Sequence, residues 1–330
     1  MPPNSSRLIS VLVGVLLVVG ITPAVPAAAD SAARSEHQRI VDFWTKDRVA
    51  QAKPRDFVRD RVTGELSPAP TATTTSVLGR SWDGGGAVQK TTGKVLFAIG
   101  RSYYVCSASV VNDTVTTRSI VLTAGHCAYD NKTAKFATNW MFVPDYDSNA
   151  VDLTTNGSFC AQTTYGCWTA SALVVHQGFA SQRKFSTQAT LYDFAFAVVY
   201  AGGKSMKQLD DTVGSQEVSF DPASTGFDTY LFGYPAAAPY TGKDLVYSEG
   251  ALGTDPLNSN KTYRVASDMT GGCSGGPWFS GFTSGGGTLI SVNSYGYNGI
   301  TAMHGPMFNT KTQALYGRAA TATANTIVGP

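Results

Sequence analysis

A serine among glycines is the first candidate for chemistry in this sequence of 330 residues. Residues 270–278 read Thr-Gly-Gly-Cys-Ser-Gly-Gly-Pro-Trp, which places Ser274 between two glycine pairs. Glycine and proline at this density are typical of a tight, exposed loop. A serine hydroxyl is a poor nucleophile at neutral pH, so Ser274 requires a base that takes its proton.

Two upstream residues supply the rest of that chemistry. His126 lies near the end of an apolar segment, Leu-Thr-Ala-Gly-His-Cys at 122–127, and Asp193 leads into the apolar segment 194–199. An aspartate at the start of such a strand is buried, where a carboxylate is costly without a partner. We therefore predict that His126 is the general base, that Asp193 holds its ring, and that Ser274 is the nucleophile.

The glycines beside the serine have a second predicted role. The backbone N–H groups of Gly272 and Ser274 can point at one carbonyl oxygen and form an oxyanion hole, where one donor contributes roughly 3 to 4 kcal/mol. Between them, Cys273 reads as a buried apolar thiol of low reactivity. The other histidines, at 37, 176 and 304, read as ordinary core or surface residues.

Composition excludes several classes of function. Hydrophobic residues make up 43% of the chain, which is enough for a real core. The net charge of +2, without a cluster of Lys and Arg, argues against a nucleic-acid partner. The sequence has no C-x-x-C and no H-x-x-x-H, so we expect no metal and no other cofactor.

The amino terminus predicts secretion. Arg7 precedes an apolar segment at 8–21, and Ala27 to Ala29 follow, which is the pattern of a signal peptide over residues 1–29. A membrane anchor is the alternative, but the apolar segment is shorter than the roughly 20 residues that a spanning helix needs. We predict an extracellular protein that leaves the membrane after signal cleavage and acts as a monomer.

Secretion permits disulfide bonds among the five cysteines. Cys160 and Cys167 flank a short glycine-containing loop and form the expected local pair. Cys106 and Cys127 are the natural second pair, which leaves Cys273 unpaired, although spacing by itself does not choose among the possible pairings.

Residues 30–80 differ in composition from the remainder. They hold nine basic and seven acidic residues, 16 charges in 51 residues, against 31 charges in residues 81–330. Ser35 to Ala52 reads as a helix and residues 67–76 as a Pro/Ala/Thr linker. We predict a propeptide and linker over 30–80, removed near Arg80; an ordered extension that the mature protein keeps is the alternative.

The remainder reads as an antiparallel all-β fold. Short β-branched or aromatic segments alternate with Gly, Asn, Asp and Ser, without the long helices of α/β folds. The predicted strands are Lys94–Ile99, Tyr103–Val111, Ser119–Thr123, Ala172–His176, Phe194–Tyr200, Thr229–Phe232, Thr288–Val292 and Met303–Met307. A break at 202–211 separates two predicted β-barrels: residues 81–204, with His126 and Asp193, and residues 205–330, with Ser274.

These motifs together resemble the secreted trypsin-like serine peptidases of the chymotrypsin fold, within their bacterial branch of V8-like glutamyl endopeptidases. The resemblance covers residues 93 to about 310. Its motifs are Cys106-Ser-Ala-Ser-Val-Val111, Thr123-Ala-Gly-His-Cys127, Asp193-Phe-Ala195, Gly272-Cys-Ser-Gly-Gly-Pro277 and Ser294-Tyr-Gly296. It implies two antiparallel six-stranded β-barrels with the active site in the cleft between them, and a disulfide between Cys106 and Cys127.

The resemblance also implies a substrate site. Ser294, Tyr295 and Gly296 would form the edge strand that pairs with a substrate backbone. Asp268 lies six residues before Ser274, where trypsin carries the carboxylate that binds Arg or Lys, and Asn293 stands where glutamyl-specific members carry a histidine.

We therefore predict a secreted serine endopeptidase, made as a zymogen, that acts on protein or peptide substrates through an acyl-enzyme and prefers basic P1 residues. The alternatives are a glutamyl-specific endopeptidase and a catalytically silent binding or adhesion protein on the same fold.

Overall fold

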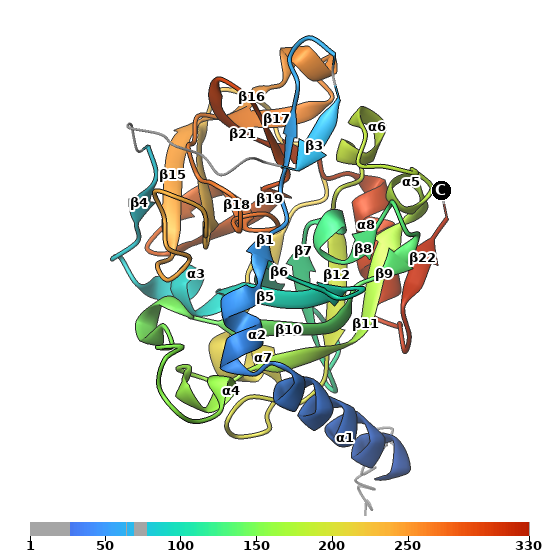
Figure 1. The fold of residues 1–330 in the computed structure, drawn as a ribbon. Helices are drawn as coiled ribbons and strands as arrows, with labels where there is room; N and C mark the ends of the chain where they lie inside the picture. The colour runs from blue at the N-terminus through green and yellow to red at the C-terminus, as the bar shows by residue number, and fades with distance from the viewer. Residues whose placement is uncertain (1–26, 64, 69–77, 330) are drawn as a thin grey trace, which may run out of the picture.

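The computed structural model describes residues 27–63, 65–68 and 78–329 (Figure 1). The predicted signal peptide therefore lies outside the described residues except for its last three, as does most of the predicted linker. Within the described ranges, no helix combines the length and apolar character needed to cross a membrane.

The first barrel is a closed sheet of six strands. Its strands are β5 (Thr92–Ile99), β6 (Ser102–Val111), β7 (Ser119–Thr123), β10 (Thr138–Pro144), β11 (Trp168–His176) and β12 (Ala195–Val199). Each pairs antiparallel with its neighbours in the order β6-β5-β10-β11-β12-β7, and the β6–β7 pairing closes the ring. The β6–β7 pairing gives β7 a neighbour on each side, and β7 and β12 are buried at every residue.

The second barrel is built from two sheets that meet along β15 against β17 and β19 against β21. One sheet has the order β13-β19-β18-β14-β15-β4 and the other the order β16-β17-β21-β20-β2-β3. Their bounds are β4 (Arg80–Ser81), β13 (Glu217–Val218), β14 (Asp228–Gly233), β15 (Val246–Ala251), β18 (Pro277–Thr283), β19 (Gly286–Val292), β16 (Gly253–Thr254), β17 (Thr262–Val265), β20 (Tyr295–Tyr297), β21 (Ile300–Pro306), β2 (Phe57–Arg59) and β3 (Leu66–Pro68).

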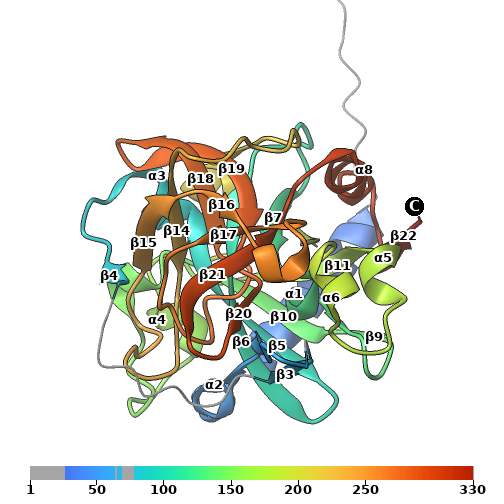
Figure 2. The same ribbon diagram turned by 90° about the horizontal axis from the view of Figure 1, so that it is seen from above.

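The predicted strands agree well with this architecture. Each of the eight predicted segments lies largely within one strand, from β5 to β21, so the all-β prediction is confirmed. Figure 2, seen from above, shows the teal and green first barrel beside the orange and red strands of the second.

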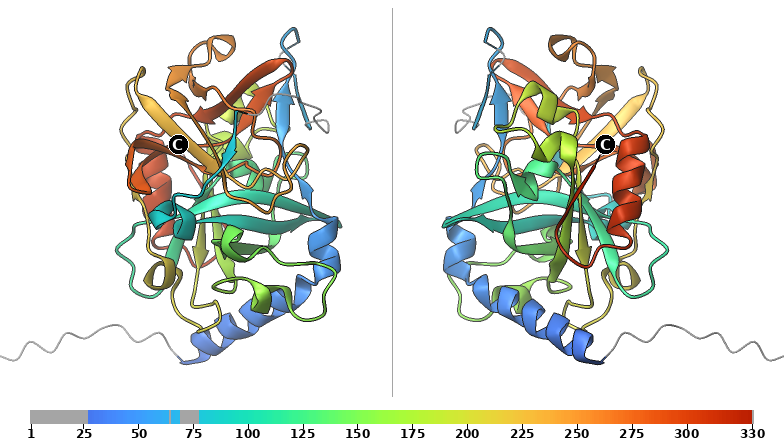
Figure 3. Two further views of the ribbon diagram at one scale, coloured as in Figure 1. Left: turned by 90° about the vertical axis from the view of Figure 1, so that its left-hand side faces the viewer. Right: turned by 90° about the vertical axis from the view of Figure 1, so that its right-hand side faces the viewer.

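The N-terminal helix differs from its prediction. The chain forms two helices, α1 (Ala27–Phe43) and α2 (Lys46–Gln51), instead of one over residues 35–52. The break falls where Thr45 caps α2, its hydroxyl accepting a hydrogen bond from Arg48 N. Ile40 and Trp44 are buried, and α1 runs along the first barrel beside β10 and β11 (Figure 3). Beyond α2, β1 (Lys53–Pro54) pairs with β6.

The carboxyl terminus returns to the first barrel. Helix α8 (Thr310–Ala319) packs against β11 and β12, and β22 (Thr326–Val328) pairs with β11. Helix α8 was not predicted, although Asn309 and Thr312 form a capping box at its start. The remaining elements are short: α3 (Gly86–Thr91), α4 (Phe159–Gln162), α5 (Gln177–Ala180), α6 (Thr187–Thr190), α7 (Leu209–Val213), β8 (Tyr129–Asp130), β9 (Lys135–Phe136), and 3₁₀ turns η1 (Gly125–Cys127), η2 (Asp147–Asn149) and η3 (Pro256–Asn258).

Both predicted disulfides are present. Cys106 bonds to Cys127, which ties β6 to the turn that carries His126, and Cys160 bonds to Cys167. Cys273 is free and buried, as predicted, and burial raises the pKa of its thiol well above the usual range. A thiol with a raised pKa carries little thiolate at neutral pH, so Cys273 is a weak nucleophile.

Candidate active site

The pairing of two strands brings His126 and Asp193 together. β7 and β12 are antiparallel, and Thr123 at the end of β7 faces Ala195 at the start of β12. His126 follows Thr123 by three residues in turn η1, and Asp193 precedes Ala195 by two. Both residues therefore leave the barrel at the same end, and both are fully buried.

Three hydrogen bonds fix the Asp193 carboxylate. Oδ2 lies 2.8 Å from Nδ1 of His126, and Oδ1 accepts a hydrogen bond from the His126 backbone N–H at 2.8 Å. The hydroxyl of Ser294 donates to Oδ2 at 2.5 Å. A carboxylate held in this way keeps the proton on Nδ1 of the imidazole, which leaves Nε2 as the proton acceptor.

Ser274 lies on a loop whose backbone requires glycine. Gly272 and Gly275 have φ angles of 103° and 81°, a region that side chains rarely adopt. A Cβ atom on Gly276 would lie 2.0 Å from the carbonyl oxygen of Phe232, so this position also admits only glycine. The loop is tied to the first barrel because Ser107 N donates to Ser274 O at 2.7 Å.

A carboxylate from the N-terminal segment sits on this loop. Asp56 Oδ1 accepts a hydrogen bond from the Ser274 hydroxyl at 2.6 Å, and Oδ2 accepts one from Gly272 N at 3.0 Å. Burial raises the pKa of the Asp56 carboxyl, while the bond from Ser274 and the nearby His126 act in the opposite direction. Asp56 was not among the residues predicted from the sequence.

Solved structures resemble the chain over most of its length. The crystal structure of protease Anisep from Arthrobacter nicotinovorans is 38% identical with a TM-score of 0.60, and the match covers 71% of this chain and 96% of that one. A thermostable serine protease, AL20, from an extremophilic microorganism is 34% identical with a TM-score of 0.59, over 72% of this chain and 99% of that one. The chain belongs to the chymotrypsin-fold serine proteases.

A Glu endopeptidase structure shares the fold of this serine protease at 18% identity, with a TM-score of 0.55, over 76% of this chain and all of that one. No family model and no curated protein sequence matches the chain. The predicted resemblance, the two-barrel fold and the class of serine-type endopeptidase are confirmed by these relatives.

One cavity of the protease brings together most of the predicted substrate residues. Asp268, Ser294, Tyr295 and Gly296 line it with Ser274. The Asp268 carboxylate already accepts three hydrogen bonds: from the Tyr240 hydroxyl at 2.6 Å, and from the backbone N–H groups of Leu78 and Gly79 at 2.7 and 2.9 Å. These partners order the chain just before β4.

Asn293 lies behind the loop of the protease that carries Ser274. It is fully buried, its side-chain oxygen accepts from the Trp278 indole at 2.7 Å, and its amide donates to the carbonyls of Phe232 and Cys273. Asn293 is not among the residues that line the cavity. Its side chain therefore stabilises the loop of Ser274 through the hydrogen bond to the Cys273 carbonyl.

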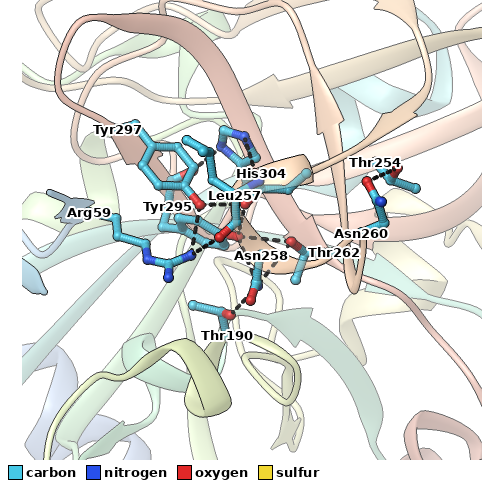
Figure 4. Close-up of polar contacts among 11 residues, drawn as sticks. Arg59, Thr190, Thr254, Leu257, Asn258, Asn260, Thr262, Tyr295, Tyr297 and His304 are labelled. Carbon is cyan, nitrogen blue, oxygen red and sulfur yellow. Dashed lines mark hydrogen bonds and ion pairs between the residues drawn. The ribbon is translucent and has the colours of Figure 1, made fainter. Parts of the chain in front are cut away.

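A buried polar network lies behind β20 (Figure 4). The carboxylate of Asp255 accepts hydrogen bonds from the hydroxyls of Tyr295 and Tyr297 at 2.7 and 2.6 Å. Thr262 bonds the Tyr295 hydroxyl at 2.8 Å, and the ring of His304 stacks on that of Tyr295 at 4.9 Å. The network holds β20, which lines the cavity, in place. Tyr295 is the one member of the network that had been predicted as a site residue.

His304 should make the stability of the protease depend on pH. Burial lowers its pKa from 6.5 to about 4, because a charged imidazole would lose its hydration. The unfolded chain then binds the proton first as pH falls, so folding should lose about 3 kcal/mol between pH 6.5 and 4 through this residue. We expect the free energy of urea unfolding to rise more steeply with pH in the wild type than in His304→Gln. Equal slopes would contradict the assignment.

Proposed function

We propose that the protein is a serine endopeptidase in which Ser274 attacks the scissile carbonyl, His126 takes its proton, and Asp193 holds the imidazole. The observation that carries this proposal is the short contact of Asp193 with His126, 2.8 Å between Oδ2 and Nδ1, beside a cavity that Ser274 lines. His126 would then return the proton to the leaving amine, and water would hydrolyse the acyl-enzyme.

The oxyanion hole is proposed at Gly272 and Ser274. Gly272 N already donates to a carboxylate oxygen at 3.0 Å, so this N–H points into the cleft, where an acyl oxyanion would develop. Backbone donors fixed in advance stabilise that charge in the transition state more than the neutral carbonyl of the substrate.

We further propose a preference for basic P1 side chains, carried by Asp268 in the wall of the cavity. An incoming Arg or Lys would share the carboxylate with Tyr240 and two backbone amides. A panel of Arg, Glu and Phe peptides tests it: faster cleavage after Arg is expected, and comparable rates for all three would contradict it.

Secretion is proposed from the signal-peptide pattern at residues 1–29, and the two disulfides fit an oxidising compartment. The substrates are then extracellular proteins or peptides.

A fluorophosphonate probe tests the nucleophile. A protease site inserted within residues 69–77 allows the N-terminal segment to be cut from the barrels. After that cut, the wild type and the control Ser224→Ala should be labelled, and Ser274→Ala should not. Absence of labelling in the folded, cut wild type would favour the silent binding protein instead.

A further inference from the structure

The N-terminal segment 53–59 lies across the nucleophile loop. β1 pairs parallel with β6, placing Lys53 opposite Tyr104, and β2 pairs parallel with β20, placing Val58 opposite Gly296. Asp56 stands between these two short strands. The blue segment runs past both barrels in Figures 1 and 3, and residues 53–58 line the cavity together with Ser274.

This segment covers the edge strand that was predicted to receive substrate. In the sheet order β21-β20-β2-β3, β2 and β3 extend β20 on its open side. A substrate backbone would need the same N–H and C=O groups of β20 for β-augmentation. While β2 is in place, that edge is unavailable to another peptide.

The Asp56 carboxylate disconnects the nucleophile from its base. The Ser274 hydroxyl directs its proton to Asp56 Oδ1 at 2.6 Å. Among the described residues, His126 Nε2 is buried and has no hydrogen-bond partner. In a working triad Nε2 accepts the serine proton, so in this arrangement the base has no hydrogen bond from the serine whose proton it would accept.

The segment also presents nothing to cleave. A side-chain oxygen of Asp56, not a peptide carbonyl, accepts the hydrogen bond from Gly272 N. A carboxylate anion is a poor electrophile because it already carries the negative charge that attack would create. The segment therefore fills the oxyanion position without becoming a substrate.

Flanking side chains hold Asp56 in this position. The Phe57 ring meets the His126 ring edge to face at 5.4 Å and stacks on Phe185 at 4.2 Å. Arg55 pairs with Asp130 at 2.6 Å and donates to the backbone carbonyl of His126. Both contacts are made to the His126 side of the cleft, so docking of the segment and shielding of the base occur together.

The Arg59 side chain anchors the far end of the segment. It donates to the Tyr297 hydroxyl and to the Leu257 carbonyl, each at 2.9 Å (Figure 4). The segment is therefore fastened on both barrels, with Asp56 at the centre.

We propose that residues 53–59 form a built-in autoinhibitory strand, in which the Asp56 carboxylate occupies the oxyanion position and accepts the hydrogen bond of the Ser274 hydroxyl, so that the protease works only after this strand leaves the cleft. This inference rests on the proposed function of Ser274 and explains how the predicted propeptide would silence it.

The rate of fluorophosphonate labelling at Ser274 tests the proposal in the full chain. The intact wild type should be labelled slowly. Asp56→Ala should be labelled about 10 to 100 times faster, as expected from the loss of one or two hydrogen bonds to a charged group. Asp47→Ala removes the same charge from the exposed face of α2 and should behave as wild type.

A second measurement needs no substitution in the barrels. The chain with the protease cleavage site inserted in 69–77, and otherwise wild type, is cut and diluted. Dilution removes the high effective concentration that the tethered segment has at the cleft. Labelling should accelerate, and a synthetic peptide of residues 46–68 should slow it again, whereas the same peptide with Asp56→Ala should not.

The outcomes separate the two proposals. Equal labelling rates in the intact wild type, in Asp56→Ala and in the cut chain would overturn the autoinhibitory strand while leaving Ser274 as the nucleophile. If no folded form were labelled, both the strand and the proposed function would fail.

Discussion

Replacing Ser274 by alanine should lower kcat for a peptide substrate by about a millionfold in the chain cut within residues 69–77, since loss of the nucleophile removes the acyl-enzyme route. The proposed oxyanion donor at Gly272 and the cavity remain, so a residual rate above the uncatalysed one is expected. The Ser274 side chain contributes little to the stability of the fold, because its hydroxyl donates its hydrogen bond to Asp56 of the N-terminal segment.

Steady-state hydrolysis of a peptide amide, with active sites titrated in the wild type, measures this effect. Near-ultraviolet circular dichroism of the variant should match that of the wild type. A variant that kept a rate within tenfold of the wild type would exclude Ser274 as nucleophile and would direct attention to another group in the cleft.

Replacing Asp193 by asparagine should lower kcat by about 10⁴-fold. The carboxylate accepts from both the backbone N–H and Nδ1 of His126, and an amide has only one oxygen for these two donors. If its oxygen stays on the backbone N–H, its NH₂ group faces Nδ1 and forces the proton onto Nε2. Nε2 then has no lone pair to accept the proton of Ser274, because the lone pair of the ring lies on Nδ1.

Ser294→Ala is the matched control for Asp193→Asn. It removes the third hydrogen bond to the same carboxylate but leaves both bonds to His126 in place. One lost hydrogen bond to a charged group corresponds to roughly tenfold in rate. Equal losses in the two variants would indicate that the tautomer of His126 is not what Asp193 controls.

The strand Ser294–Gly296 has three separable roles in this structure. Ser294 bonds Asp193, Tyr295 enters the network around Asp255, and Gly296 faces Val58 of the N-terminal segment. Alternation along the chain accounts for the opposite directions of the Ser294 and Tyr295 side chains, whereas Gly296 meets Val58 through backbone pairing of β20 with β2. A sequence motif shows that the strand matters, but not which neighbour each residue meets.

The fold could largely be predicted because its signals are local. β-branched and aromatic segments of strand length, such as those of β7 and β12, favour strands that are buried within a sheet. The two disulfide pairs followed from spacing and the family resemblance. Helix α8 was overlooked because its apolar positions are few, and its capping box was the available signal.

The position of Asp56 in the cleft could not be predicted from the sequence. It lies 218 residues from Ser274 and carries no motif, and its segment looked only like charged propeptide. Pairing of β1 with β6 and of β2 with β20 brings it to the cleft, and such pairings depend on contacts between distant parts of the chain. Asp255 was missed for the same reason, and the contacts that Asn293 makes with Trp278, Phe232 and Cys273 were not readable from its motif.

The sequence by itself determined the order of the three candidate catalytic residues, the strand or glycine loop that carries each, and the kind of fold, because apolar patterning and backbone freedom are properties of adjacent residues. Only the tertiary structure decided which groups meet: Asp193 with His126 and Ser294, Asp268 with Tyr240, and Asp56 with Ser274. The position of a carboxylate in a cleft depends on the packing of both barrels and the strand between them, and no local pattern encodes that packing.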